Sequence, residues 1–170
     1  MPIVAGDIDY FLSGGGANSD PDASLGAAIS STEIVDASIH NLFDVVGSAE
    51  ASAGDIEYRC VYVKNSHGSL ALQSAEVYIL TNTPSADTDV SIGLDPAGVN
   101  GTAVDNTGSG ESTAPAGVSF SQPGSGTPLA IGDIPAGQHQ AIWIRRNVTA
   151  AASAYSGDTV VLRVRGDTAA

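Results

Sequence analysis

From residue 56 the chain reads IEYRCVYVKN, a run rich in aromatic and β-branched side chains. This composition favours a β-strand, and the sequence NSHG at residues 65–68 is typical of a turn behind it. Residues 70–80 have the composition of a second strand. We therefore expect residues 56–65 and 70–80 to pair as antiparallel neighbours.

Further short strand signals, separated by glycine, proline and asparagine, follow along the chain. With residues 56–65 and 70–80 they make seven to nine strands, near the number in an immunoglobulin-like sandwich. The sequence therefore predicts an all-β fold, an immunoglobulin-like antiparallel β-sandwich with an N-terminal arm. The further candidates are residues 90–94, 118–120, 129–131, 138–148 and 158–165.

The last two candidates also predict part of the core. Val160, Leu162 and Val164 recur at every second position, so they face one side of a strand. We expect this side, or the strand at residues 56–65, to pack against Trp143 or its neighbours Ile142 and Ile144.

The first 55 residues differ from the rest because they contain nine acidic residues and no Lys or Arg. We expect residues 1–30 to form an N-terminal arm or edge strand with a Gly-rich turn, and residues 31–170 to form the sandwich domain. Such an arm completes its own sheet or adds a strand to a neighbouring subunit. The candidate partner-docking residues are Ile8, Tyr10, Phe11 and Leu12.

Residues 30–54 allow two interpretations. The sequence SSTE at residues 30–33 has capping-box spacing, and Val35, Ile39, Leu42 and Val46 follow at helical spacing. A short helix is one expectation. The other is a strand at residues 33–36 followed by an irregular turn through residues 41–54.

Composition excludes several classes of partner. Six Lys and Arg against nineteen Asp and Glu give a net charge of −13, so the chain has no basic patch for nucleic acid or an anionic membrane. The single cysteine, Cys60, cannot form an internal disulfide. We find no signal peptide or membrane-spanning run and expect a cytosolic protein, or one that assembles there into something larger.

The cations are confined to the three strongest predicted strands. They are Arg59, Lys64, Arg145, Arg146, Arg163 and Arg165. They either meet acids of the arm or of a neighbouring subunit, or form ordinary solvated faces and protected edges.

No motif for catalysis is present, and we expect no catalytic, cofactor-binding or metal-binding residues. The sequence contains no G-x-S-x-G, P-loop or dinucleotide-binding motif. His40, His67 and His139 lack metal-ligand spacing. Calcium is the remaining inorganic candidate, because residues 20–22 and 87–89 each place two aspartates two positions apart, although aspartates that form turns explain both pairs.

Six motifs along the chain consist of strand and turn sequences. They are GDIEYRCVYVKN at 54–65, AEVYI at 75–79, IGL at 92–94, ESTAPAGVSF at 111–120, LAIGDIPAG at 129–137 and AIWIRR at 141–146. Together they resemble a group of small structural proteins encoded by tailed bacteriophages, and the resemblance covers roughly residues 30–167, most of the chain.

The resemblance implies a non-enzymatic virion protein with an immunoglobulin-like sandwich. The first expectation is a capsid decoration, or cement, protein that stabilises the outer capsid surface. Its partners would be the major capsid protein or other virion subunits, and it would form a homo-oligomer on a particle assembled in the host cytoplasm. The alternative is a tail, neck or baseplate accessory protein with an immunoglobulin-like adhesion or glycan-binding module.

Overall fold

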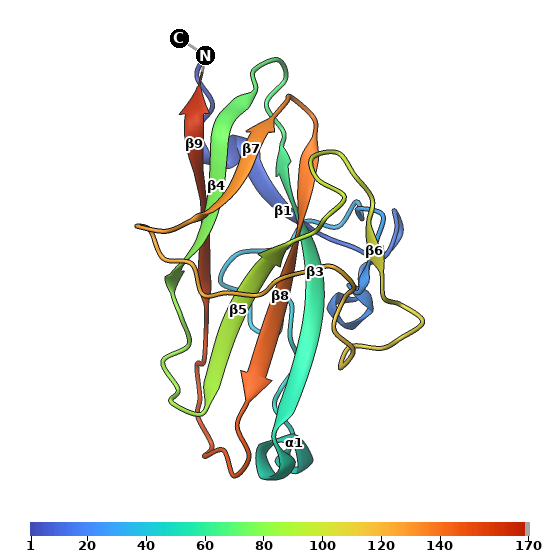
Figure 1. Cartoon of the computed structure of the whole chain (residues 1–170), viewed down its shortest axis with the longest axis vertical. Coiled ribbons are helices and arrows are strands. Elements are labelled where there is room, and N and C mark those ends of the chain that lie inside the picture. Colours follow the sequence, from blue (N-terminus) through green and yellow to red (C-terminus); the bar gives the residue numbers. More distant parts are fainter. Residues whose placement is uncertain (169–170) are drawn as a thin grey trace.

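The computed structural model describes residues 1–168, and its regular structure is almost entirely antiparallel β-sheet (Figure 1). The expected all-β class is therefore confirmed. The described residues contain nine strands, one short α-helix, α1 (Ser48–Ala53), and two 3-10 helices, Ala5–Asp7 and Pro21–Ala23. One sheet has the order β1-β3-β8-β5, and its strands are β1 (Ile8–Leu12), β3 (Asp55–Asn65), β5 (Thr88–Leu94) and β8 (His139–Val148).

A second sheet has the order β7-β4-β9 and lies against the first. Its strands are β4 (Leu72–Thr81), β7 (Leu129–Ile134) and β9 (Val161–Thr168). A third, two-stranded sheet pairs β2 (Gly26–Ala27) with β6 (Ala103–Asp105). In Figure 1 the N-terminus and the end of β9 lie at one end of the molecule, and α1 lies at the other.

β3 and β8 form the centre of the four-stranded sheet. They pair antiparallel from Asp55↔Val148 to Lys64↔His139, and β1 and β5 flank them. Over residues 60–63 and 141–144 both strands are apolar on both faces, as is typical of strands that are covered on both sides. The alternation of side chains therefore divides the interior into two cores, one on each face of this sheet.

The first core lies between the two large sheets. Val61 and Val63 of β3 meet Ile142 and Ile144 of β8, and Leu162 and Val164 of β9 pack against this cluster. The expected contacts of Ile142 and Ile144 are thus confirmed, and Trp143 points to the opposite face. β4 and β7 complete the core with Leu72, Ala75, Val77, Ile79 and Ile134.

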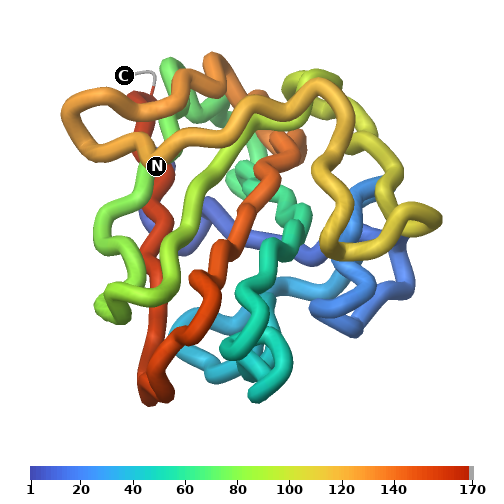
Figure 2. Tube along the Cα trace, turned by 60° about the horizontal axis from the view of Figure 1, so that its bottom comes forward, coloured from blue at the N-terminus to red at the C-terminus, as the bar shows by residue number. Residues whose placement is uncertain are grey.

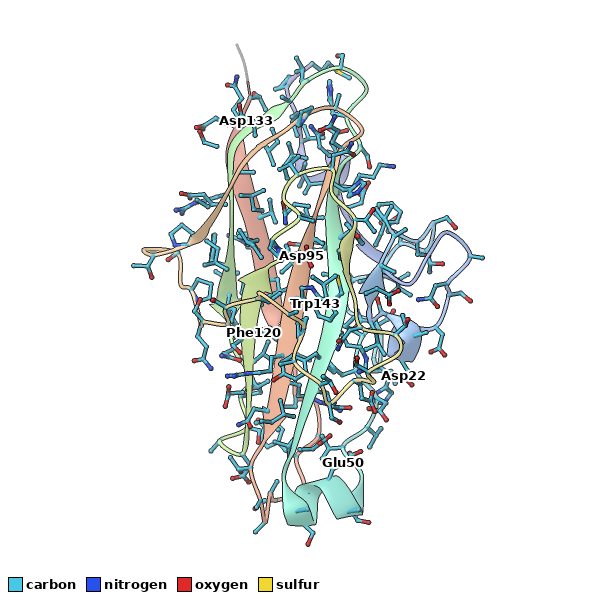
Figure 3. The ribbon with its side chains drawn as sticks, turned by 45° about the vertical axis from the view of Figure 1, so that its right-hand side comes forward. Asp22, Glu50, Asp95, Phe120, Asp133 and Trp143 are labelled. Carbon is cyan, nitrogen blue, oxygen red and sulfur yellow. The ribbon has the colours of Figure 1, made fainter. Side chains whose placement is uncertain are left out.

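The second core lies on the other face, under an additional layer formed by β2, β6 and the loops around them. Trp143 and Tyr62 are fully buried there. The indole Nε1 of Trp143 donates to Oδ2 of the buried Asp95 at 2.9 Å, and both residues are labelled near the middle of the sheet in Figure 3. The hydroxyl of Tyr62 donates to Ala27 O at 2.5 Å and accepts from Ala103 N at 2.8 Å, so it links β2 to β6. Figure 2 shows these two parts of the chain side by side.

One predicted strand pairing is wrong. β4 exists at the expected place but pairs with β7 and β9 in the other sheet, not with β3. The connection between β3 and β4 is a corner: Nδ2 of Asn65 donates to Leu70 O and to Ile134 O, at 2.8 and 2.9 Å. His67 Nδ1 accepts from the backbone N–H groups of Ser69 and Leu70. These bonds direct the chain across the sandwich instead of back along β3.

The helix considered for residues 35–46 does not form. Ala37 and His40 have φ values of 58° and 54°, which a right-handed helix does not allow. Glu33 makes a single bridge to Phe11, and the chain is then irregular until α1, so the alternative interpretation is closer. The candidate strand at residues 118–120 is likewise reduced to one bridge between Ser121 and Ile92. Among the described residues, no helix has the length and apolar character needed to span a membrane.

Replacing Leu162 by Ala tests the register of β9. Leu162 packs into the first core, whereas its neighbour Val161 points outward and is 44% exposed. Because Leu162 is only partly buried, we expect Leu162→Ala to lower the free energy of unfolding by about 2 kcal/mol, and Val161→Ala by less than about 0.5 kcal/mol. Denaturant unfolding of both variants is the measurement. A larger loss for Val161→Ala than for Leu162→Ala would mean that the two faces of β9 have been exchanged, and equal losses would contradict the expected difference.

A pair of glycines tests the additional layer. Gly26 has a φ of 90°, and a Cβ atom there would lie 1.8 Å from Val104 O and 2.9 Å from the ring of Trp143. Gly15 has a φ of 95° and open space around it. Both Gly→Ala changes share the backbone strain, which is about 1 kcal/mol. We expect only Gly26→Ala to lose at least about 2 kcal/mol more and to shift Trp143 fluorescence. Similar losses for both variants would contradict the tight contact of β2 with β6.

Candidate docking surface

The structure places the four predicted docking residues inside the molecule's own sheet. β1 pairs with β3 from Ile8↔Asn65 to Leu12↔Val61. Ile8 and Tyr10 pack against the first core, Phe11 packs against the second, and Leu12 is only 2% exposed. In the isolated chain the arm thus completes its own sheet. A role of these residues in binding a partner stays a prediction.

The outer edge of β1 is also occupied. Leu12 N donates to Thr32 O at 3.0 Å, Ser30 N donates to Leu12 O at 2.8 Å, and Ile34 N donates to Tyr10 O at 2.7 Å. Residues 10–12 are therefore hydrogen-bonded on both sides. A strand from another subunit could pair with them only after displacing residues 30–34.

Three of the most exposed apolar side chains lie instead on residues 33–46, which we call the acidic segment. Val35, Ile39 and Val45 are 65%, 85% and 63% exposed. The side chains of Glu33, Asp36 and Asp44 are exposed beside them. Exposed apolar side chains among charged ones are a feature of protein-binding surfaces. The helical spacing of Val35 and Ile39 allowed a short helix as one of two interpretations, and neither interpretation predicted that these side chains are exposed.

Two side chains in the middle of the acidic segment anchor it to the sandwich. Leu42 and Phe43 pack against the first core. The guanidinium groups of Arg146 and Arg59 lie 4.8 and 5.4 Å from the centre of the Phe43 ring. Arg146 Nη1 also donates to Asp44 O at 2.7 Å. The anchored residues hold the remainder of the segment at the surface.

Arg59 and Arg146 belong to a buried ion network at the inner face of β3 and β8. Glu57 and Arg146 are cross-strand partners, and Arg146 Nε donates to Glu57 Oε2 at 2.5 Å. Arg59 is fully buried, and its Nη2 lies 2.6 Å from Glu111 and 3.1 Å from Asp22. The contact with Asp22 confirms that a strand cation meets an acid of the first 30 residues. The network ties three irregular segments to the central strands.

The acid at the centre of this network is strongly desolvated. Only 3% of the Glu57 side chain is exposed. Burial raises the pKa of its carboxyl, and the charges of Arg146 and Arg59 oppose that rise. Removing either arginine would therefore leave a buried acid without its compensating charge.

The other titratable groups of interest have structural partners. The ring of His139 packs edge-on against Tyr62 at 4.9 Å, and burial lowers its pKa, with a further contribution from the charge of Lys64. His67 accepts turn N–H groups, and His40 is exposed. Cys60 is buried, and this burial raises the pKa of its thiol. These positions give the histidines no shared site.

The aspartate pairs considered for calcium also bind protein groups. Asp20 caps a turn by accepting from Asp22 N, and Asp22 binds Arg59. Asp87 accepts from Ser153 N, and Asp89 accepts from the side-chain amides of Gln122 and Asn147. Within residues 1–168, no group of three or more histidine, cysteine or carboxylate side chains is placed to hold a metal ion.

Comparison with known proteins gave no match to any family model, curated protein or solved structure.

Replacing Arg146 by Met tests the ion network. The change keeps an unbranched side chain but leaves Glu57 buried without its closest partner, so we expect a loss of about 3 kcal/mol in the free energy of unfolding. The matched control is Arg165→Met, which breaks the more exposed Arg165–Glu76 pair and should lose less than about 1 kcal/mol. Hydrogen exchange should also speed up in residues 36–46 of the Arg146 variant alone. Equal losses in both variants would show that the network does not hold the segment.

Proposed function

We propose that this chain is a non-enzymatic structural protein of a tailed-bacteriophage virion that decorates and stabilises the outer capsid surface. The resemblance of its strand and turn motifs to phage structural proteins supports the virion setting. Those motifs lie on β3, β4, β5 and β8, on β7 with the turn that follows it, and on the loop at residues 111–120. Likeness in fold and motifs alone does not define a function, so the function is inferred from the exposed surface of the molecule.

The acidic segment is the observation that carries the proposal. It exposes three β-branched side chains, and buried ion pairs and a stacked phenylalanine hold it in place. The carboxylates of Glu57 and Asp44 beside it pair with Arg146, as they would in a scaffold. This combination favours docking onto another protein of the particle, a capsid subunit or another copy of this chain, over chemistry in a pocket.

The connectivity of the sandwich bears on the proposed immunoglobulin likeness. Lettered A to G along the chain, the seven strands of the two large sheets give the sheets A-B-F-D and E-C-G, whereas immunoglobulin constant domains have ABED and CFG. Here β3 pairs with β8 in one sheet, and β4 pairs with β7 in the other. The chain changes sheet between β3 and β4 and again between β7 and β8. We propose that this is jelly-roll connectivity, which also occurs in viral capsid proteins. The likeness to an immunoglobulin domain is then limited to the two-layer build.

The copy number in purified particles tests the proposed location. A decoration protein should approach the copy number of the major capsid protein, as measured by quantitative mass spectrometry of intact virions. A few copies in multiples of three or six would instead assign the chain to the tail, neck or baseplate. Absence from the particle would reject a virion role altogether.

Single substitutions test the docking role of the acidic segment. Because Val35 is exposed, we expect Val35→Ser to keep the stability of the chain and to weaken its binding to particles stripped of it by about tenfold or more. The matched control is Val4→Ser, a similarly exposed valine on the N-terminal arm. Co-sedimentation with particles is the measurement. A loss in the Val4 variant alone would assign docking to the arm.

A further inference from the structure

A second surface of the molecule has the opposite character to the acidic segment. On the outer face of the β7-β4-β9 sheet, Tyr78 of β4 pairs with Arg163 of β9, and Glu76 pairs with Arg165. Leu80 and Val161 are each 44% exposed there. We call the outward side of Leu80, Val161 and Arg163 the β4–β9 face. It combines exposed apolar groups with a cation.

Arg163 differs from the other cations of the described residues. Arg59 and Arg146 lie in the buried network, and Arg165 pairs with Glu76. Lys64 and Arg145 lie over the rings of Phe11 and Phe120. Within residues 1–168, Arg163 has neither a carboxylate within ion-pair distance nor an aromatic ring beneath it. An exposed, unpaired arginine is the side chain that a carboxylate-bearing partner binds best.

The acidic segment has unpaired carboxylates, and they too lie beside exposed apolar side chains. Glu33 and Asp36 are exposed, no cation lies within ion-pair distance of either within residues 1–168, and Asp36 is next to the exposed Val35. The two surfaces thus present complementary charges beside β-branched or leucine side chains. Contact between them would remove apolar surface from water on both sides and bring Arg163 near a carboxylate.

We infer that the acidic segment of one copy of this chain binds the β4–β9 face of a second copy. The inference rests on the proposed docking role of the acidic segment and names its partner. A partner for the acidic segment should offer exposed apolar groups beside a cation. The β4–β9 face of a second copy of this chain offers both. Pairing between two β9 edges is a different contact, because it would not involve the acidic segment.

Charge reversal tests this contact with the full chain. The measurement is sedimentation equilibrium over about two orders of magnitude in concentration, at low and at high salt. Asp36→Arg and Arg163→Asp are each expected to weaken self-association about tenfold or more. An equimolar mixture of the two variants, and the double variant, which restores the net charge of −13, should recover the association of the unmodified chain. Because salt screens the attraction between Arg163 and the carboxylate, the loss caused by each charge reversal should be smaller at high salt.

Matched controls separate this contact from other effects. Asp105→Arg changes the net charge as Asp36→Arg does, but Asp105 is exposed on β6, in the additional layer on the far side of the β1-β3-β8-β5 sheet from the β4–β9 face. This control should associate like the unmodified chain, and thermal unfolding should confirm that every variant is folded.

Several results would overturn the inference. They are a monomeric unmodified chain over the whole range, no recovery in the mixture, or sensitivity to Arg163→Asp without sensitivity to Asp36→Arg, which would indicate pairing of β9 edges. The copy number on particles is measured independently, so failure here leaves the proposed location intact. Recovery by charge exchange in a chain absent from particles would reject only the location.

Discussion

The pairing of β3 with β8 is the constraint on which the rest of the structure depends. Ten consecutive residue pairs join the two strands, and most of their side chains are removed from water. A ladder that is apolar on both faces needs a cover on each side. The β7-β4-β9 sheet covers one face, and the layer around β2 and β6 covers the other through Tyr62 and Trp143. The order of layers therefore follows from two central strands.

The same pairing of β3 with β8 explains how the irregular acidic segment is held at the surface. Toward α1 the inner positions of β3 and β8 change from valine and isoleucine to Glu57, Arg59 and Arg146. Buried charges are tolerated only when they are paired, so this end of the sandwich requires carboxylates and an aromatic cover from elsewhere in the chain. Asp22, Asp44, Glu111 and Phe43 supply them. The ion pairs thus fix the acidic segment, although Val35 and Ile39 remain in water.

Local signals were enough to predict most strands but not their partners. The alternation in β9 and the apolar runs of β3 and β8 depend on neighbouring residues only, and these predictions were correct. The pairing of β4 was wrong because the corner depends on Asn65 bonding to Ile134, which is distant in sequence. The exposure of Val35 and Ile39 was not predicted, because their spacing allowed a helix and the alternative was an irregular turn. Only the backbone at Ala37 and His40, which no spacing rule describes, shows otherwise.

We propose that the acidic segment and the β4–β9 face are contact surfaces on an assembled particle. Hydroxyl-radical footprinting measures the solvent exposure of individual side chains in both the free chain and the intact virion. We expect the labelling of Val35, Ile39 and Val161 to fall strongly in the virion. The labelling of Val4 and Tyr155, which are also exposed, should change little. Unchanged labelling of Val35 and Ile39, with protection limited to residues 1–12, would contradict it.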